Sequence, residues 1–595
     1  MSLYAVPAAL NADAYKSGHI YQYPEDTKDL FFNLTARSDK YFNTPLAKDG
    51  IISFGVQRFC EDYLRDHWND TFFNRPKKEV VDETLEIMNG VLGEGAIGRE
   101  HWEALHDLGY LPVILDAVPE GTLLPIKAPM LAFKPTLDGF AWVAGYLEDV
   151  VSDEIWKATT IATIAFHYKR ICKKWSDITC DNDLHMPWQC HDFALRGLSG
   201  VTDGAFNSVG HLTSFQGTDN FAAVYTAKRV YGEGMTVSEI AGSIPATEHS
   251  VMTANIIREA QQQFNTLDAT DAQRAVGERL TFKRFLTEVY PTGLLSLVSD
   301  SFNYWRTIGT IAAELRQTIM EREGKLVFRP DSGNPFHVVC GYKTIHFDQA
   351  KAIILQRMER NVSSYGSLTI EHVKSIQEAD AKNLPHLDDW IKRAGYELLV
   401  WNEDEDGADT LKLDTLEVRY MSIEEIQGSI QTLWNIFGGT INDKGYKILD
   451  PHVGIIYGDS ITMELADKIF ERMALNDFAS SNIVFGIGSF TYQYITRDTF
   501  GFAVKATNAK IADDEIMLCK EPITDMGLKK SAKGCVLPVV DSETGEIKAV
   551  DQLSFESYED LVASDETLFQ LFFCDGVCFS TTSLKEIRNK IDSQL

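Results

Sequence analysis

Three apolar runs of this chain end in residues that suit a sugar phosphate. Residues 327–335 (VFRPDSGNP), 453–459 (VGIIYGD) and 482–488 (NIVFGIG) each lead into a glycine turn, and the first two also carry a carboxylate. Barrel strands deliver polar groups to a ligand in this way at their carboxyl ends. Carboxylates bind hydroxyls or a metal, whereas backbone N–H groups in a glycine turn bind phosphate. The pattern predicts one site that combines both.

Residues 191–197 (HDFALRG) and the region around Asp219 could bind a ring and its substituents. Phe193 and Arg196 are three residues apart, so on a helix they would share a face and could bind a flat ring and a phosphate or carboxylate. Taken alone, a core phenylalanine beside a surface arginine is preferred. Asp219 precedes an apolar helix beginning at Phe221, and by sequence alone a helix cap is favoured over a ligand role.

His249 and Asp300 stand beside predicted helix starts. The helix dipole at such a position favours neutral imidazole or a bound anion, and would stabilise a phosphorylated histidine. For His249 alone, a buried and satisfied histidine is slightly preferred. Asp300 lies in a Ser-Asp-Ser triplet that is also a good helix cap. Its functional interpretation gains weight because Arg329 and Asp331 end the next predicted strand.

The overall composition excludes several classes of protein. The net charge of −30 argues against a general nucleic-acid or anionic-membrane binder, although a local cluster can still be basic. Arg497, Lys505, Lys520 and Lys529 form such a loose series, for which solvated side chains are the alternative to phosphate binding. Nine scattered cysteines without a zinc pattern fit reduced thiols in a cytosol. Neither a signal-like N-terminus nor an apolar window of membrane-spanning length is present, so we expect a cytoplasmic protein.

The length of 595 residues indicates more than one core. Residues 1–150 mix strand-like and helical stretches. From about residue 151 to 491, helices alternate with short apolar runs, which is the rhythm of α/β units. Within that region, residues 341–429 are acidic and helix-rich, and we expect a peripheral insertion there.

Taken in order, these segments resemble the nicotinamide phosphoribosyltransferases, a family of type II phosphoribosyltransferases. Further matching stretches are residues 13–16 (DAYK), 243–250 (SIPATEHS), 298–301 (VSDS) and 444–447 (KGYK). No single motif is specific, but their combination is. The resemblance implies an incomplete α/β barrel packed on an α/β domain formed by both chain ends, in which residues 492–595 complete residues 1–150.

The resemblance further implies transfer of a phosphoribosyl group from phosphoribosyl pyrophosphate to nicotinamide, giving nicotinamide mononucleotide and pyrophosphate in NAD salvage. It implies Mg²⁺, ATP as a co-substrate that phosphorylates His249 beside Glu248, and a homodimer with shared active sites. Phe193 and Tyr15 of the partner subunit would sandwich the ring, Asp219 would accept from its amide, and Asp331 would hold the ribose hydroxyls.

The other implied roles concern ligand contacts, and Asp300 would additionally stand near the metal or its waters. The implied substrate-binding residues are Tyr15, Phe193, Arg196, Asp219, Ser243, Ser296, Asp300, Arg329, Asp331, Gly458, Asp459, Gly488 and Ser489, and the implied phosphate-binding residues are Arg37, Arg497, Lys505, Lys520 and Lys529.

The sequence departs from the family at two phosphate-binding positions. Phe490 follows the glycine turn where a small residue is usual, and Ala503 stands where a serine is usual. The nearest alternative function is a nicotinate phosphoribosyltransferase, but Asp219 would repel a carboxylate substrate. An inactive phosphoribosyl-binding or signalling protein would not need His249 and Asp331 together with Asp219. A barrel glycosidase would not need the glycine turns.

Overall fold

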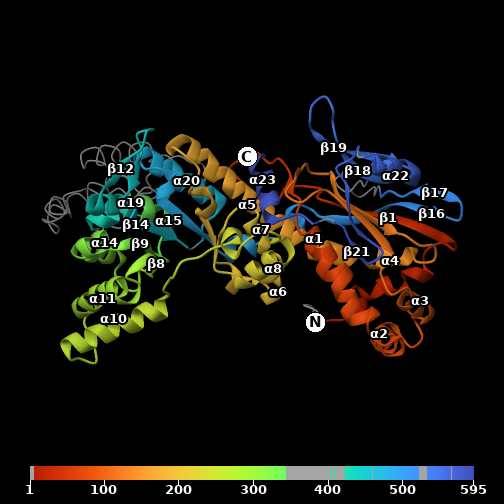
Figure 1. Cartoon of the computed structure of the whole chain (residues 1–595), viewed down its shortest axis with the longest axis horizontal. Coiled ribbons are helices and arrows are strands. Elements are labelled where there is room, and N and C mark those ends of the chain that lie inside the picture. The colour runs from red at the N-terminus through yellow and green to blue at the C-terminus, as the bar shows by residue number, and fades with distance from the viewer. Residues whose placement is uncertain are drawn as a thin grey trace, which may run out of the picture.

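The computed structural model describes residues 6–342, 402–403, 409–410, 422–458, 460–520, 532–564, 566–579 and 581–595. Two large β-sheets lie toward opposite ends of the long axis of the molecule, and helices pack around each (Figure 1). Within the described residues, no helix is both long and apolar enough to cross a membrane.

The first sheet has six strands, and all of its strand pairs are parallel. Its inner strands come from nearly continuous apolar runs, because a parallel strand that is covered on both faces buries side chains in both directions. Every residue of β14 is buried, for example. In order across the sheet, the strands are β7 (Gly217–Thr218), β6 (Cys190–Asp192), β15 (Ile483–Ile487), β14 (Val453–Tyr457), β9 (Glu323–Arg329) and β8 (Thr292–Val298).

Residues 242–247 join the two edges of this sheet. Gly242 pairs in parallel with β7, and Ala246 pairs in parallel with β8. The N–H of Gly242 donates to the carbonyl of Gln216 at 2.9 Å, and the N–H of Thr247 donates to the carbonyl of Ser296 at 3.0 Å. The sheet is therefore curled into a half-barrel, and the carboxyl ends of its strands surround one opening.

Helices follow the strands, as parallel connections require. Most are amphipathic and turn an apolar stripe toward the sheet, as α20 does with Ala466, Ile469, Phe470 and Met473. The helices of this half that matter below are α8 (Phe221–Tyr231), α10 (His249–Phe264), α11 (Asp271–Arg284), α15 (Pro335–Cys340), α19 (Ile423–Phe437), α20 (Met463–Leu475) and α21 (Ser489–Tyr492).

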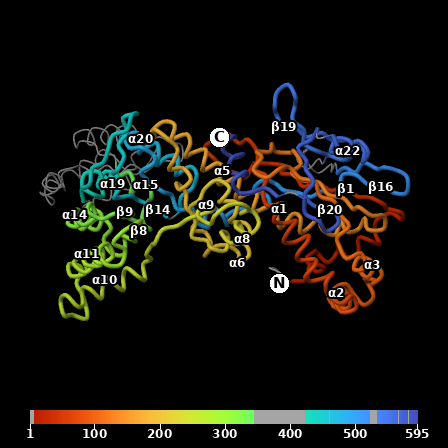
Figure 2. The backbone as a smooth tube through the Cα atoms, in the orientation of Figure 1, coloured from red at the N-terminus to blue at the C-terminus, as the bar shows by residue number. Residues whose placement is uncertain are grey.

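The second sheet is antiparallel and takes strands from both chain ends. In Figure 2, the N-terminal and C-terminal segments accordingly run together in one half of the molecule. Helix α22 (Phe555–Ala563) lies over this sheet, with Tyr558 packed edge-on against Phe31 at 4.9 Å. In order, the strands are β17 (Asp514–Met517), β16 (Ala503–Ile511), β1 (Thr27–Thr35), β5 (Pro129–Pro135), β3 (Val113–Ala117), β20 (Gln570–Cys574) and β21 (Val577–Cys578).

Two helices tie the halves together. Helix α5 (Glu148–Thr179) has 32 residues and is therefore about 48 Å long. Glu148 at its start pairs with Lys16 of the antiparallel half, whereas Trp175 near its end donates to Asp467 of α20 at 2.6 Å. The C-terminal helix α23 (Leu584–Asp592) returns to the barrel half, where the guanidinium of Arg588 donates to carbonyls that flank β7.

The α/β class and the domain built from both chain ends are as the sequence predicted. The segment predicted as an insertion begins where α15 ends and stops within α19. Its two ends lie side by side, because the N–H of Tyr342 donates to the carbonyl of Ile426 at 2.8 Å. A side chain at Gly341 would come within 2.3 Å of the same carbonyl, so the close approach depends on glycine. Most of the segment between these ends lies outside the described residues.

Candidate active site

The carboxyl ends of the parallel strands bring most of the predicted site residues to one opening. Phe193 follows β6, Asp219 follows β7 and Asp300 follows β8. Arg329 ends β9, and Gly458 follows β14. Segments more than 250 residues apart in the chain thus meet, because parallel strands all end at the same edge.

Asp219 accepts two hydrogen bonds and does not cap the helix that follows it. Nε2 of His191 lies 2.9 Å from Oδ1 of Asp219, and the hydroxyl of Ser243 donates to the same oxygen. The cap of α8 is Asn220, whose side chain accepts from the N–H of Ala223 at 3.2 Å. The cap interpretation of Asp219 is therefore wrong. Oδ2 of Asp219 accepts no hydrogen bond from the described part of the chain.

The surroundings of Asp219 keep it ionised. Burial on its own would raise the pKa of this carboxyl, but the hydrogen bonds from His191 and Ser243 and the charge of Arg329 outweigh burial, so the pKa is lowered. The side chain remains 44% exposed. A negatively charged acceptor therefore faces the opening.

Phe193 forms an aromatic wall beside this acceptor. Its ring lies 4.5 Å from the ring of His191, and the guanidinium of Arg329 lies 5.2 Å from its centroid. The wall packs on glycine backbone: a Cβ at Gly486 would come within 2.8 Å of the Phe193 ring and within 2.5 Å of Gly458. Glycine at position 486 is thus required for the ring to lie flat here.

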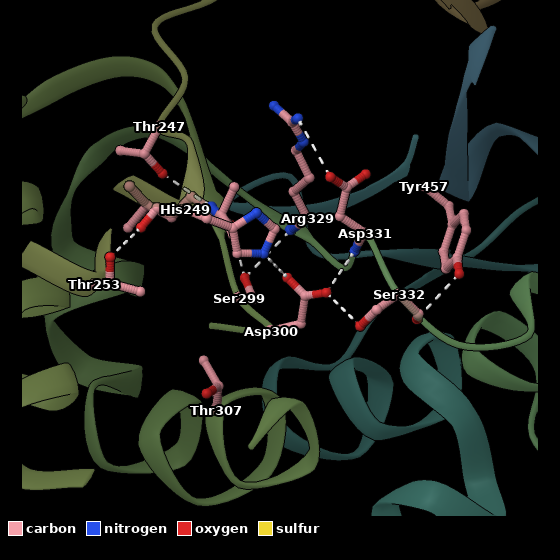
Figure 3. A network of polar contacts seen from close by, with 12 residues as sticks. Thr247, His249, Thr253, Ser299, Asp300, Thr307, Arg329, Asp331, Ser332 and Tyr457 are labelled. Atoms are coloured by element: carbon pink, nitrogen blue, oxygen red, sulfur yellow. Dashed lines mark hydrogen bonds and ion pairs between the residues drawn. The ribbon is translucent and has the colours of Figure 1, made fainter. Parts of the chain in front are cut away.

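Asp300 joins His249 to the loop after β9 (Figure 3). Only 4% of its side chain is exposed. Oδ1 accepts from Nε2 of His249 at 3.1 Å, whereas Oδ2 accepts from the N–H of Asp331 at 3.0 Å and from the hydroxyl of Ser332 at 2.6 Å. Three donors from two segments thus meet on one carboxylate, which fixes the loop that presents Asp331. The carboxylate of Asp331 is 30% exposed and lies 4.0 Å from Arg329.

His249 is the first residue of α10 and is 48% exposed. The preference for a buried histidine is therefore wrong, and Asp300 is its hydrogen-bond partner. Glu248 occupies the cap position of α10, but its side chain accepts from the hydroxyl of Ser250 and from no backbone N–H of the helix. A partly exposed imidazole at a helix start, bound to a buried carboxylate, has the surroundings of a nucleophile.

The glycine turn after β15 leads into α21. Gly488 precedes this short helix and Ser489 is its first residue. A Cβ at Gly197 would come within 2.1 Å of the Ser489 hydroxyl, so the two segments are in close contact. Phe490 is 49% exposed and packs on Tyr494 with ring centroids 5.1 Å apart.

Two further predicted site residues, Arg196 and Ser296, lie in the barrel half. Arg196 is exposed on a short 3-10 turn that starts after Phe193, so the shared helical face proposed for these two residues is wrong. Ser296 is 3% exposed, and its hydroxyl has no partner among the described residues. Asp459 and Lys529 lie outside the described residues.

The predicted phosphate-binding residues lie on the antiparallel half. Burial lowers the pKa of Lys505 and the nearby charges of Arg37, Arg497 and Lys16 lower it further, while Glu148 acts in the opposite direction. Nζ of Lys505 lies 3.8 Å from Glu148. Four cations around one carboxylate leave an excess of positive charge, which suits a polyphosphate.

Tyr15 and Lys520 belong to the same half of the molecule. Tyr15 lies on a 3-10 helix (Ala14–Tyr21), is 57% exposed and has Lys16 over its ring at 5.7 Å. Lys520 is exposed after β17. Within one chain these residues belong to a different sheet from Phe193 and Asp331.

Sequence reasoning missed two sets of residues that the structure brings to these sites. His191 stood in the motif that named Phe193, but only the fold shows that it bonds Asp219. Lys16 and Glu148 are 132 residues apart and form a partly buried ion pair in the basic cluster. The sequence around Lys16 or Glu148 does not indicate this contact, since an ion pair between distant residues leaves no spacing pattern.

Comparison with known proteins identifies the family. A model of the nicotinate phosphoribosyltransferase (NAPRTase) family matches residues 188–385 and 414–560. A protein of Acinetobacter baylyi named nicotinamide phosphoribosyltransferase is 37% identical over 98% of this chain and 97% of its own length. The chain belongs to the nicotinate phosphoribosyltransferase family. A second protein of that name, from Mycoplasma pneumoniae, is 29% identical over 87% of this chain and 92% of its own. The crystal structure of human nicotinic acid phosphoribosyltransferase aligns over 98% of this chain and 93% of its own at 14% identity and a TM-score of 0.47.

Proposed function

We propose that this protein is a nicotinamide phosphoribosyltransferase, which transfers the 5-phosphoribosyl group of phosphoribosyl pyrophosphate to nicotinamide in NAD salvage. Family membership supports the reaction class. The ionised Asp219 beside the Phe193 ring is the observation that carries the choice of substrate. An amide N–H can donate to this carboxylate, whereas the carboxylate of nicotinate would be repelled. The names of the relatives from A. baylyi and M. pneumoniae agree.

The ring and the ribose would be held by the barrel half. Nicotinamide would stack on Phe193 with its amide toward Asp219, whose position is set by His191 and Ser243. Asp331 would accept from the ribose hydroxyls. Its position is set by Asp300, which accepts a hydrogen bond from the backbone N–H of Asp331. Departure of pyrophosphate leaves an oxocarbenium-like ribose, so a nearby carboxylate stabilises the developing positive charge.

The leaving group would be stabilised by cations of a second subunit. Arg37, Arg497 and Lys505 surround a surface suited to a polyphosphate, and exposed Tyr15 lies on the same half. In the proposed homodimer, this half of one chain covers the barrel opening of the other. Each site would then combine residues of both chains and exclude water from the reaction.

Magnesium and ATP belong to the same proposal. Among the described residues no three His, Cys, Asp or Glu side chains form a metal cluster. Mg²⁺ is, however, usually held by one or two carboxylates together with substrate phosphates. The partly exposed Asp331 fits that pattern, whereas Asp300, whose two oxygens already accept from the chain, would stand near the metal or its waters. A bound Mg²⁺ would neutralise charge on the pyrophosphate. ATP would phosphorylate Nε2 or Nδ1 of His249, with Asp300 orienting the ring. The nine cysteines, all free thiols, favour a reducing cytoplasm.

A product assay tests this proposal. The purified protein, phosphoribosyl pyrophosphate and Mg²⁺ are incubated with nicotinamide or nicotinate, each with and without ATP, and the mononucleotides are separated by chromatography. We expect nicotinamide mononucleotide as the main product and more of it with ATP. Preferential formation of nicotinate mononucleotide would instead identify a nicotinate phosphoribosyltransferase.

Labelling with [γ-³²P]ATP tests the role of His249. An acid-labile, base-stable label is expected on the wild type and not on His249→Ala, which should retain ATP-independent turnover. His452→Ala is a matched control, because His452 also bonds an aspartate, Asp450, but lies at the amino end of β14 and not at the carboxyl ends of the strands. Label that persists in His249→Ala would disprove the assignment.

A further inference from the structure

A second cavity lies on the antiparallel half, between the sheet and α22. Its volume is about 570 Å³, within the usual range of small-molecule sites. Strands β1, β3 and β5 contribute Asp29, Asp116 and Lys134 to its lining, and α22 contributes Tyr558 and Glu559. In Figure 1, α22 lies over β1 and β16 at the end of the molecule away from β8 and β9. The cavity is therefore separate from the barrel opening.

Two carboxylates in this cavity have oxygen atoms without partners. Asp116 is 5% exposed; its Oδ2 accepts from the hydroxyl of Tyr558 at 2.8 Å, but its Oδ1 has no hydrogen-bond partner among the described residues. Oδ1 of Asp29 is also buried without a partner there. Buried polar atoms in native proteins are nearly always bonded, so two such oxygens lining one cavity indicate a missing donor.

The lysines of the cavity are already compensated or exposed. Nζ of Lys134 pairs with Glu559 at 2.5 Å and lies 3.6 Å from Oδ2 of Asp29. Lys28 also lines the cavity, and it pairs at 3.3 Å with Asp513, which does not. Lys510 is exposed at the mouth. The uncompensated groups inside are therefore acceptors, so the interior suits a cation and not an anion.

The remaining lining is largely apolar. It includes Ile114, Pro135, Leu137, Val562 and Leu571. An apolar lining with a few convergent polar groups is typical of sites for small organic molecules. An inorganic cation would leave these apolar walls uncovered, whereas an amine with a hydrocarbon body would cover them.

We propose that this cavity binds a small organic ammonium ion whose apolar body packs on Leu137, Val562 and Leu571, and whose N–H groups donate to Asp29 and Asp116. The site is distinct from the basic cluster, because neither Lys505 nor its neighbours Arg37 and Arg497 line the cavity. It is independent of the proposed transferase function. Asp116 takes no part in the barrel site, so its replacement leaves turnover unchanged.

The probe for this site is 4-fluorobenzylamine, observed by ¹⁹F NMR with the full-length protein. The neutral isostere 4-fluorobenzyl alcohol and the anionic 4-fluorobenzoate serve as ligand controls. We expect saturable binding of the amine with a Kd of about 1 mM, which is ordinary for so small a ligand. We expect no saturable binding of either control.

Three variants locate the binding. Asp116→Asn should weaken amine binding about tenfold, since it removes one charge-assisted contact. Ala563→Trp should abolish it by filling the exposed mouth without disturbing the core. Asp541→Asn, at an exposed hairpin with its own lysine partner, is the matched control and should bind as the wild type does.

Each outcome decides the proposal. Weaker amine binding in Asp116→Asn and its loss in Ala563→Trp, together with unchanged binding in Asp541→Asn, support the site. Binding that survives both variants lies elsewhere, the barrel opening included, and overturns it. Equal binding of the alcohol or the benzoate shows that the carboxylates do not select the ligand, and absence of saturable amine binding shows that the cavity is not a site; either result overturns the proposal.

Discussion

Asp300 in the barrel half and Asp116 in the antiparallel half are almost equally buried, with 4% of the Asp300 side chain and 5% of the Asp116 residue exposed. Asp300 accepts three hydrogen bonds, whereas Asp116 accepts one and keeps an oxygen without a partner. A fully bonded buried carboxylate stabilises one geometry, but a half-bonded one costs free energy until a ligand supplies the donor. The first arrangement suits the fixed frame of an active site, and the second suits a ligand pocket.

The comparison extends to the two halves as wholes. The barrel half presents carboxylates and an aromatic ring at its strand ends, whereas the antiparallel half presents cations around Lys505. A phosphoribosyl donor carries groups that need both. Neither half is complete for the proposed reaction, which is the physical argument for an active site shared between two chains.

The largest expected effect comes from two single variants, each of which removes a charged side chain from one half of the chain. Asp331→Ala and Arg497→Ala should each lose at least about 10³-fold in kcat/KM, because each removes a charge needed in the transition state. Refolded together, the two variants should form mixed dimers in which one site has both defects and the other has neither. Random pairing makes about half of the dimers mixed, so activity should recover to roughly a quarter of wild type.

Mass spectrometry must confirm the mixed dimers in that experiment. No recovery in their presence would show that Asp331 and Arg497 act within one chain. Asp331→Ala mixed with a second barrel variant, Asp219→Ala, is the control and should not recover, since both residues come from the same half of the chain.

Asp300→Asn should give the next largest effect. Asparagine has one carbonyl oxygen in place of two carboxylate oxygens, so at least one of the donors on His249, Asp331 and Ser332 loses the acceptor that it has in the wild type. The free energy of unfolding from urea denaturation should fall by about 2–3 kcal/mol. ATP-dependent labelling of His249 should fall as well. A loss of stability of less than about 0.5 kcal/mol would contradict the three-donor arrangement.

Asp219→Ser should change substrate selectivity more than stability. The preference for nicotinamide over nicotinate, as the ratio of the two kcat/KM values, should fall by about 10- to 100-fold, because about 1–3 kcal/mol of discrimination is lost. Ser243→Ala, which removes one donor to Asp219 and keeps its charge, is the matched control and should retain most of the preference. An unchanged ratio in Asp219→Ser would remove the argument for an amide substrate.

The sequence predicted those parts of this arrangement that are local. A strand followed by a turn with a polar residue is visible in residues 327–335, and the structure places Arg329 and Asp331 at the end of β9 as expected. The α/β class followed from helices alternating with apolar runs and, for the domain made of both ends, from the family resemblance.

The parts that could not be predicted depend on pairs of distant residues. Nothing near Asp219 in the sequence shows that Asn220 would cap α8 and leave the carboxylate to His191. The exposure of His249 depends on how the segment 242–247 crosses from β7 to β8. The cavity under α22 combines strands from both chain ends, so no single motif could indicate it.

The smallest effect is expected from Asp116→Asn. This variant should raise the free energy of unfolding, whereas Asp300→Asn should lower it. Burial raises the pKa of Asp116 to about 6 in the folded protein, although the hydrogen bond from Tyr558 acts in the opposite direction. In the unfolded chain an aspartate ionises near pH 4, at about 3.9. Between these pKa values the folded state binds more protons than the unfolded state, so this group lowers the stability of the wild type as pH rises from about 4 to about 6.

Asparagine carries no such charge, so the variant should be more stable than the wild type by about 1–2 kcal/mol at pH 8, without amine present. The difference should narrow as pH falls through 6, because the wild-type carboxyl then becomes protonated in the folded state. Urea denaturation of both proteins at several pH values measures this difference directly and cancels contributions from Asp29 and the other carboxyls. If Asp116→Asn destabilised the protein as Asp300→Asn does, the carboxylate of Asp116 would be fully bonded in the folded state. The contrast between the two halves, and with it the reason to expect a cation in the second cavity, would then fail.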